Sequence, residues 1–246
     1  MRRLFAVCFA VALLAGCGGG DPAGTSAAAS AATSTPAASA EPIAPCVDPQ
    51  DPDLAAVHLQ PKAGVEVDAV LAGTGSTGIV FSNMSGETLC GWLPTALAHV
   101  RKGYRVALYE YSADQSPDAD LAVVADELRR RGATRIALVG ASMGGTTSVV
   151  AANAVKAAAV FVLSAPGAYS GMDAVGAVSR VAVPSWFGVG EQDTEFVPSA
   201  RDLYKHSAAP RKQLKILPTG AHGTALLGGT VDTMLADFLR TNAPAA

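Results

Sequence analysis

The 246-residue chain carries 18 Lys and Arg against 21 Asp and Glu, and 50% of its residues are hydrophobic. This length fits one α/β domain or two small ones. A net charge of −3 without a basic stripe excludes the electrostatic footprint that a nucleic-acid-binding protein needs. The longest apolar run, residues 4–15, falls short of the roughly 20 residues that a membrane-spanning helix requires.

The amino terminus has the parts of a secretory signal. Two arginines precede the apolar run 4–15, and a small residue follows it. The run ends in Leu-Ala-Gly-Cys at positions 14–17, which resembles the lipobox of bacterial lipoproteins. That resemblance implies cleavage of a signal peptide, residues 1–16, and export of a protein anchored to a membrane of the bacterial cell envelope by a lipid on Cys17. The alternative is an ordinary signal peptide with an incidental cysteine.

A segment of small residues follows the expected lipidation site. Of residues 18–45, 25 of 28 are Ala, Ser, Thr, Pro or Gly. Such a composition buries too little apolar surface to offset the entropy of ordering the chain. We therefore expect residues 17–45 to be a disordered tether and residues 46–246 to be the folded domain.

The cysteines agree with export. Cys8 would leave with the signal peptide and Cys17 would take the lipid, so Cys46 and Cys90 remain in an oxidising compartment. We expect these two to form a disulfide. Two buried free thiols are the alternative.

From residue 65 onward, short β-branched runs alternate with longer amphipathic segments. The pattern predicts strands at residues 65–71, 78–82, 104–111, 135–139, 157–163, 184–189 and 213–217. It predicts helices at residues 91–102, 118–130, 142–155, 173–178 and 199–207, and a final amphipathic helix over 227–238. Alternating strands and helices imply a three-layer α/β/α sandwich with a doubly wound, mostly parallel sheet. Ligands of such sheets bind at the carboxyl ends of the strands.

The glycine-rich segment 73–78 matches the dinucleotide-binding pattern G-x-G-x-x-G. A dinucleotide site needs a helix directly after these glycines, whereas residues 79–81 continue as a strand, and no acidic residue lies about 20 positions on. We interpret the segment as a hairpin turn and expect no nucleotide cofactor.

A second motif, Gly-Ala-Ser-Met-Gly at positions 140–144, matches G-x-S-x-G. It lies between an expected strand and an expected helix, which is the setting in which this motif exposes a nucleophilic serine on a sharp turn. Small flanking residues keep such a turn free of collisions. Ser142 is therefore the candidate nucleophile, and a simple helix cap is the alternative.

A serine nucleophile needs a base, and a base needs an acid that orients it. Of the four histidines, His222 follows the expected strand 213–217, at the edge where Ser142 emerges. We expect His58, His99 and His206 to be surface or packing residues.

Acidic residues follow the preceding strand, 184–189, at its carboxyl end. Asp193 is the best placed of them. Glu191 and Glu195 are rivals, and Asp173 is a weaker one because a variant arrangement puts the acid after the previous strand.

The chain order Ser142, Asp193, His222 is the order of the α/β-hydrolase fold, and residues 65–240 resemble the α/β-hydrolase family. The resemblance implies that fold, a Ser-Asp-His triad and hydrolysis of an ester or related acyl bond in a small molecule. No cofactor is implied, and no metal, because the histidines and cysteines show no ligand spacing along the chain.

An oxyanion hole usually needs two backbone N–H donors. One should be the amide of Met143, directly after the nucleophile. By the resemblance, the other should be the amide of Met84. Many hydrolases have His-Gly before that donor, whereas this chain has Ser82-Asn83, and Asn is among the few residues that tolerate a left-handed backbone.

Larger family members insert a cap domain after the strand equivalent to 157–163. Here only about 20 residues, 164–183, are available, so we expect no substantial lid and an open site suited to small substrates. Met84, Trp92, Met143 and Tyr169 are candidates for its rim.

Two other functions fit the same residues. The scaffold could serve a non-catalytic binding lipoprotein, because fold does not fix function. The same acyl-enzyme could also pass its acyl group to an alcohol, which would make the protein an acyltransferase.

Overall fold

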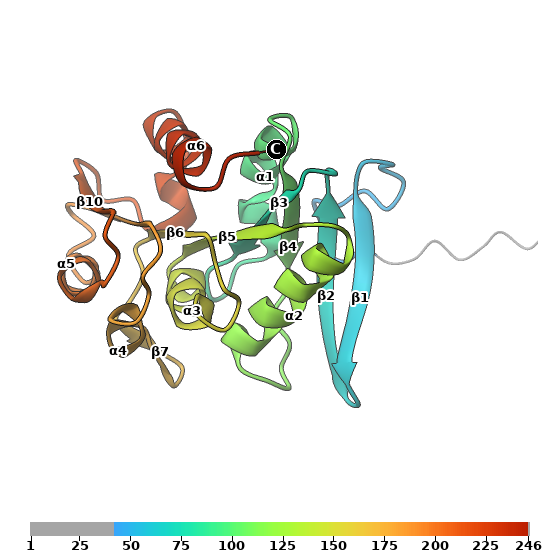
Figure 1. Ribbon diagram of the computed structural model, residues 1–246, viewed down its shortest axis with the longest axis horizontal. Helices are drawn as coiled ribbons and strands as arrows, with labels where there is room; N and C mark the ends of the chain where they lie inside the picture. The colour runs from blue at the N-terminus through green and yellow to red at the C-terminus, as the bar shows by residue number, and fades with distance from the viewer. Residues whose placement is uncertain (1–41, 246) are drawn as a thin grey trace, which may run out of the picture. The chain divides into compact units, whose positions relative to one another are not determined.

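The computed structural model describes residues 42–245 and places eight strands in one sheet (Figure 1). The expected signal peptide, Cys17 and the tether as far as residue 41 lie outside the described residues. Residues 42–45 of the expected tether are described, and Ala44 is already buried against the core. None of the helices among the described residues is long and apolar enough to cross a membrane.

Six neighbouring strands of the sheet run parallel, and two antiparallel strands complete one edge. The spatial order is β1-β2-β4-β3-β5-β6-β9-β10, and every pair from β4 to β10 is parallel. The strands are β1 (Ala55–Lys62), β2 (Val65–Ala72), β3 (Thr77–Ser82), β4 (Arg105–Tyr109), β5 (Arg135–Ala141), β6 (Ala159–Leu163), β9 (Ser185–Gly190) and β10 (Lys212–Leu217).

Helices cover both faces of this sheet (Figure 1). One face carries α2 (Pro117–Arg130), α3 (Met143–Ala151), α4 (Ala174–Val178) and α5 (Val197–His206). The opposite face carries α1 (Leu93–Val100) and α6 (Thr230–Asn242), and short 3₁₀ turns lie at η1 (Leu89–Gly91) and η2 (Gly223–Leu226). The fold is the three-layer α/β/α arrangement that the alternating pattern predicted.

The strand β5 shows why the central strands are apolar along their whole length. Ile136 and Leu138 belong to the core on the side of α2 and α3, whereas Ala137 and Val139 belong to the core on the side of α1 and α6. Successive side chains of a strand point to opposite faces. A strand covered by helices on both sides must therefore be apolar at every position.

The segment 73–78 is not a hairpin turn, contrary to the sequence-based interpretation. β2 and β3 are not neighbours, because β4 lies between them: Leu108 pairs with Val70 on one side and with Phe81 on the other. The glycines of this segment are needed for close packing of the backbone. A side chain at Gly75 would overlap the carbonyl oxygen of Gly103, so the glycines allow this segment to pass close to the turn before β4.

The antiparallel edge of the sheet is a hairpin of β1 and β2, and β1 lies before residue 65, where the predicted strands begin. β1 pairs with β2 through a tight connection at Gly64, whose φ is +78°. In β1, Val57 and Leu59 turn inward and alternate with the exposed His58 and Gln60. This strand was missing from the sequence-based prediction.

Two helices are shorter than predicted. A 3₁₀ turn, η1, precedes α1, which begins at Leu93 with Pro94 in its first turn, where a missing N–H costs nothing. α3 ends at Ala151, before the predicted residue 155.

The connection from β6 to β9 holds only two two-residue strands, β7 (Ala168–Tyr169) and β8 (Met172–Asp173), and α4. This is too little chain to cover the carboxyl ends of the strands with a domain, so the fold has no substantial lid.

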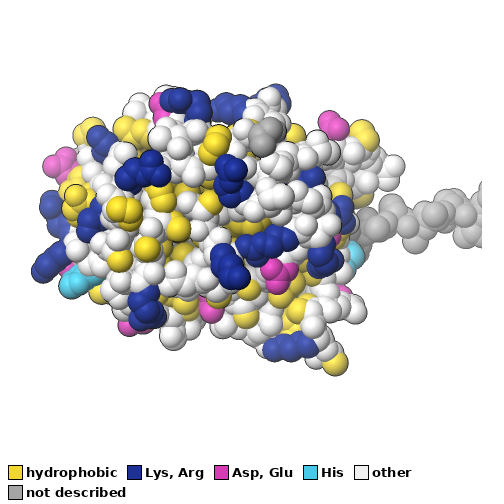
Figure 2. Space-filling view, in the orientation of Figure 1, with side chains coloured by type: hydrophobic (Ala, Val, Ile, Leu, Met, Phe, Trp, Pro, Cys, Tyr) yellow, Lys and Arg dark blue, Asp and Glu magenta, His cyan; other side chains and the backbone are white. Residues whose placement is uncertain are grey.

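On the face shown in Figure 2, Lys and Arg side chains are spread among uncharged ones.

Candidate active site

Six parallel strands end at one edge of the sheet, and five of these ends lead into residues of the candidate site. β3 leads to Asn83 and Met84, β5 to Ser142 and β6 to Ser164. β9 and β10 lead to the loops that carry the candidate acid and base. Because the strands are parallel, their carboxyl ends share one edge, as the sequence pattern predicted.

Ser142 lies on the turn between β5 and α3. Its backbone is left-handed, with φ 49° and ψ −120°, which is costly for a residue with a side chain. A side chain at Gly144 would overlap the Ser82 carbonyl oxygen, so only glycine lets α3 start so close to β3. The Ser142 side chain makes no capping hydrogen bond within the described chain, and its N–H donates to Leu163 O at 2.8 Å. The strained turn thus leaves the hydroxyl free of a structural role as a helix cap.

His222 and Asp193 form a hydrogen-bonded pair. The imidazole Nδ1 lies 2.8 Å from Asp193 Oδ2, and the side chains are 31% and 10% exposed. With Nδ1–H donating to the carboxylate, the other ring nitrogen, Nε2, is free to accept a proton. Both side chains are partly buried, and the lower local dielectric strengthens the electrostatic attraction between the imidazole and the carboxylate.

The rival carboxylates lie elsewhere. Glu191 and Glu195 are exposed. Asp173 caps the start of α4, where Oδ1 accepts the Gly176 N–H at 2.8 Å. Among the described acidic residues, Asp193 is the one within hydrogen-bond distance of His222.

Ser164 joins this pair and was not recognised in the sequence. The buried Ser164 Oγ donates to Asp193 Oδ2 at 2.8 Å, and the Ser164 N–H donates to Gly188 O at 2.7 Å. Its φ is 47°, the second left-handed serine in the site. The available signal was its place directly after a buried strand, at the carboxyl edge. Through its neighbour Leu163, which accepts the Ser142 N–H, this serine links the nucleophile turn to the acid.

No hydrogen bond among residues 42–245 joins Ser142 Oγ to His222. Catalytic hydrogen bonds are often long in structures without substrate and shorten when the substrate binds. The turns that carry both residues lie close to the loop after β3. A side chain at Gly144 would overlap the carbonyl oxygens of Ser82 and Asn83, and one at Gly223, whose φ is +55°, would overlap the Met84 sulfur. The other face of the imidazole lies against Phe196, with ring centroids 4.2 Å apart.

The loop after β3 is held rigidly. Asn83 is buried, its side-chain amide donates to Glu87 O at 2.7 Å, and its carbonyl oxygen accepts the Tyr111 hydroxyl at 3.1 Å. That carbonyl belongs to the same peptide group as the Met84 N–H, so Tyr111 fixes the plane of this N–H. Burial raises the pKa of Tyr111 to about 12, so its hydroxyl stays protonated and able to donate even well above neutral pH.

The two amides that the sequence predicted for an oxyanion hole are free. Among the described residues, neither the Met84 N–H nor the Met143 N–H donates a hydrogen bond to another protein group. An N–H at the start of a helix, such as that of Met143, has no partner within the helix. Neither N–H group is therefore engaged by another group within residues 42–245.

The four residues predicted for the rim differ in exposure. Tyr169 is exposed, and its hydroxyl donates to Ser85 Oγ at 2.9 Å, whereas Met143 is buried and Met84 is half-buried. Trp92 belongs to the core. It is fully buried, its ring lies 5.3 Å from that of Phe81, and its Nε1–H donates to the Ser82 carbonyl oxygen.

The predicted disulfide is confirmed. Cys46 and Cys90 are bonded, with their Cα atoms 5.7 Å apart. The bond ties the start of the folded chain to the 3₁₀ turn before α1.

The remaining histidines lie away from the site. His206 is exposed, and His58 is exposed on β1. His99 is buried in α1, 5.7 Å from the Tyr104 ring, with Nδ1 bonded to Thr95 O at 2.9 Å.

No protein-family model matches the chain, and no curated protein matches it. Solved structures resemble it instead. An esterase from Pyrococcus furiosus superposes with a TM-score of 0.65 at 12% identity, over 77% of this chain and 90% of its own. A dienelactone hydrolase from Anabaena variabilis gives a TM-score of 0.64 at 16% identity, over 77% of this chain and 97% of its own.

A serine hydrolase without a lid, from Xanthomonas campestris, gives a TM-score of 0.61 at 17% identity, over 79% of this chain and 97% of its own. At these identities the likeness establishes architecture. The chain therefore has the α/β-hydrolase fold, with a mostly parallel sheet and no substantial lid.

Proposed function

We propose that the protein is a serine hydrolase that cleaves an ester bond of a small molecule through an acyl-enzyme on Ser142. The observation that carries this proposal is the hydrogen bond between His222 and the half-buried Asp193, at the sheet edge where the strained turn exposes Ser142. A neutral serine is a weak nucleophile, and an imidazole oriented by a carboxylate is a general solution to that problem.

In the proposed reaction, Ser142 Oγ attacks the ester carbonyl carbon and His222 Nε2 takes the hydroxyl proton. Asp193 accepts the Nδ1–H bond throughout and stabilises the imidazolium. The C–O bond of the ester then breaks, and the imidazolium returns the proton to the departing alcohol. Water, activated by the same imidazole, releases the acid and restores Ser142.

The attack places negative charge on the former carbonyl oxygen. We assign its two donors to the N–H groups of Met143 and Met84, which have no other partner among the described residues. Removing one such donor in a comparable enzyme costs about 3–4 kcal/mol of transition-state stabilisation. The Tyr111 bond to the Asn83 carbonyl holds the Met84 N–H in place before substrate binds.

Two observations support a small ester as the substrate class: the similar structures, and the short connection between β6 and β9. Solved structures with this fold include an esterase, a dienelactone hydrolase and a lidless serine hydrolase. Only two short strands and α4 separate β6 from β9, so the site is open and suits a small ester better than a long acyl chain that needs enclosure.

Hydrolysis of p-nitrophenyl acetate by the purified chain tests this function. We expect turnover by the wild type and a loss of at least about 10³-fold in both Ser142→Ala and His222→Ala. His206→Ala, which changes an exposed histidine on another helix, should retain full activity. No turnover by the folded wild type would favour a binding lipoprotein over an enzyme. Transfer of the acetyl group to added alcohol in preference to water would favour an acyltransferase.

Rates of hydrolysis of a panel of short esters, thioesters and amides would show which acyl bond the protein cleaves best. An open ester site predicts rates that fall as the acyl chain lengthens, because nothing encloses the added methylenes. A rate that rises steadily with chain length would contradict the open site.

We propose further that the protein is exported and held to a bacterial membrane by a lipid on Cys17, with residues 18–41 as its tether, since Ala44 is already buried in the folded domain. The support is the sequence Leu-Ala-Gly-Cys after a short apolar run and a charged start. Wild-type protein should fractionate with membranes and incorporate labelled palmitate. Cys17→Ser should lose both properties and keep its esterase activity, and palmitate incorporation by that variant would contradict the assignment.

A further inference from the structure

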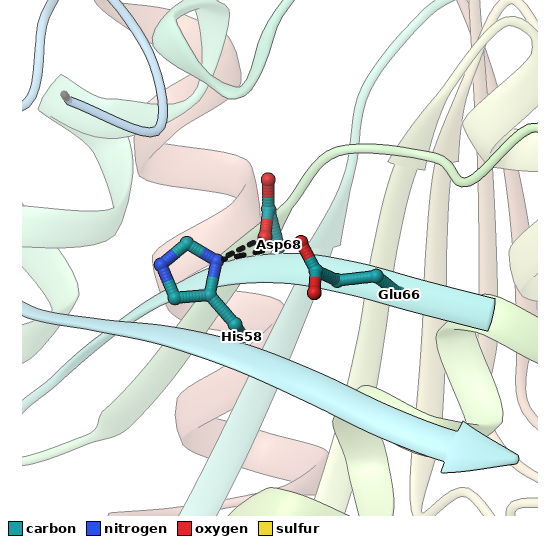
Figure 3. Close-up of side chains that lie close together, drawn as sticks. All are labelled: His58, Glu66 and Asp68. Atoms are coloured by element: carbon teal, nitrogen blue, oxygen red, sulfur yellow. Dashed lines mark hydrogen bonds and ion pairs between the residues drawn. The ribbon is translucent and has the colours of Figure 1, made fainter. Parts of the chain in front are cut away.

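We propose that His58, Glu66 and Asp68 form a binding site for one divalent transition-metal ion, with Zn²⁺ as the best-fitting member of that class. The three residues lie on the β1–β2 hairpin, the outer edge of the sheet, and the proposed hydrolase chemistry does not involve them. Figure 3 shows the imidazole from β1 and the two carboxylates from β2 turned toward one another.

The backbone pairing explains why the three side chains meet. His58 lies directly opposite Asp68 in the antiparallel pair, and Glu66 is two residues from Asp68 on the same strand. Directly opposite residues and residues two apart share one face of a sheet. All three therefore project from the same side of the hairpin, and the register shift of this pair lies beyond Leu59, between the His58–Asp68 pair and the turn. Spacing along the sequence does not reveal the group.

The donor atoms lie at distances that a single ion can bridge. His58 Nδ1 lies 2.6 Å from Asp68 Oδ1 and 3.8 Å from Glu66 Oε1, and the three donors lie within 4.8 Å of one another. Ligands about 2.0–2.1 Å from a tetrahedral ion lie roughly 3.3 Å apart. The His58–Asp68 contact must open slightly and the Glu66 contact must close slightly, which rotations of exposed side chains allow.

One neighbouring side chain holds a carboxylate in place, and one backbone bond fixes the strand, without using the donor atoms. Gln60 Nε2 donates to Glu66 Oε2 at 3.1 Å, which leaves Oε1 to face the imidazole. The Asp68 carbonyl oxygen accepts the Glu110 N–H at 2.9 Å, which ties this residue to the next strand. Such supporting bonds orient ligands and commonly change metal affinity 10- to 100-fold.

The local charge favours a cation. Within residues 42–245, the ion pairs of Glu66 and Asp68 are both with His58, so two carboxylates share one imidazole. A simple surface ion pair would need only one of these carboxylates.

The donor set selects the class of metal. One imidazole nitrogen and two carboxylate oxygens suit Zn²⁺ and related transition metals, whereas Mg²⁺ and Ca²⁺ prefer oxygen ligands alone. Three protein ligands leave a fourth position of a tetrahedral ion to water, and His58 and Glu66 are exposed enough for water to reach it. The bound ion would cross-link β1 to β2 at the end of the sheet.

Calorimetric titration of the full chain with Zn²⁺, without an affinity tag that contains histidine and after removal of metals, tests the proposal. We expect one Zn²⁺ per chain and a rise of a few degrees in the melting temperature at saturation. His58→Ala and Asp68→Asn should each weaken binding by more than about 100-fold, and Gln60→Ala by roughly 10-fold. Esterase activity of His58→Ala should equal that of the wild type.

Matched controls separate this site from other histidines. His206→Ala and His222→Ala should bind Zn²⁺ as the wild type does, because neither residue lies on the hairpin. Equal binding by His58→Ala and the wild type, binding lost in His222→Ala, or no binding at about 100 μM Zn²⁺ would overturn the proposal. Competition by Ca²⁺ at a concentration equal to that of Zn²⁺ would overturn the assigned class of metal.

Discussion

At the scale of single residues, two serines in the site have left-handed backbone. Ser142 and Ser164 have φ values of 49° and 47°, and each follows a buried parallel strand. Non-glycine residues in this region cost about 1–3 kcal/mol each and persist where the surroundings determine them. Ser142 is held by β5, by α3 and by its N–H bond to Leu163, and Ser164 by its bonds to Gly188 and Asp193.

Asp193→Asn tests the acid of the proposed triad. The amide would donate where the carboxylate accepts, so the imidazole would take the wrong tautomer and kcat should fall by about 10⁴-fold with the fold intact. Steady-state kinetics with p-nitrophenyl acetate and circular dichroism would measure both. Glu191→Gln is the matched control and should keep full activity, because Glu191 is exposed and does not contact His222. Full activity in Asp193→Asn would move the acid to another residue.

Ser164 is a positioning residue in this account, and comparing alanine with glycine tests that role. Ser164→Ala and Ser164→Gly both remove the hydroxyl that donates to Asp193, so both should lower kcat about tenfold with little change in KM. Glycine should be the more stable of the two variants, since it adopts positive φ without strain. If instead Ser164→Gly had a kcat close to that of the wild type and only the less stable Ser164→Ala lost activity, the serine would be a structural residue only.

The sequence predicted those site residues whose signal is local. Ser142 has its pentapeptide, and Asp193 and His222 follow apolar runs that read as strands. Ser164 and Tyr111 carry no such signal, because each acts on a residue distant in the chain: Ser164 on Asp193, and Tyr111 on the Asn83 carbonyl.

At the scale of elements, α1 packs against the sheet through a buried histidine. Burial lowers the pKa of His99 below 6.5, and within the described residues its Nε2 has no hydrogen-bond partner. The unfolded chain takes up a proton at about pH 6.5, whereas the folded chain resists it until the lower folded pKa is reached. Above pH 6.5 His99 is neutral in both states and does not change the free energy of unfolding. As the pH falls from 6.5 through the folded pKa, the unfolded chain binds the proton first, so the free energy of unfolding decreases.

His99→Phe should remove this pH dependence. Relative to the variant, the wild type should lose at most about 1.4 kcal/mol of unfolding free energy for each pH unit below the unfolded pKa. Urea unfolding at pH 7.5 and at pH 5.5 would measure the difference. His206→Ala, which changes an exposed histidine, should follow the wild type at both values. A constant difference between His99→Phe and the wild type would contradict the prediction.

Helices and strands could be predicted where the local sequence pattern is strong. The order of the strands in the sheet could not be predicted from local patterns. β5 and α2 were found because one is apolar throughout and the other carries an apolar stripe. β1 was missed because only its inward side chains are apolar, on an edge strand with one covered face. The error at residues 73–78 arose because strand order depends on long-range pairing: β4 inserts between β2 and β3, and the glycines alone do not encode this.

At the scale of the whole molecule, the Cys46–Cys90 disulfide closes a loop of 44 residues that contains β1, β2 and β3. Such a cross-link restricts the unfolded chain by about 4 kcal/mol in the entropic model. The double variant Cys46→Ala, Cys90→Ala should therefore have a lower melting temperature and, if folded, the same kcat. Calorimetry in the presence and absence of reductant would measure the change. An unchanged melting temperature of the wild type on full reduction would contradict this role.

The three-layer arrangement was predictable as a whole because alternation of strands and helices leaves few stable packings. Six parallel strands end at one edge, and this common edge brings Ser142 and the His222–Asp193 pair to the same part of the fold although they are up to 80 residues apart in the chain. The central claim is that this convergence makes the Ser142 hydroxyl a nucleophile.

Covalent labelling with a fluorophosphonate tests that claim most directly, because the reagent forms a stable bond only with an activated serine. Mass spectrometry of the purified chain should show one adduct per molecule, located on the peptide that contains Ser142. Ser142→Ala should show none, and His222→Ala should be labelled far more slowly. An adduct that persists at the wild-type rate in Ser142→Ala would contradict the account.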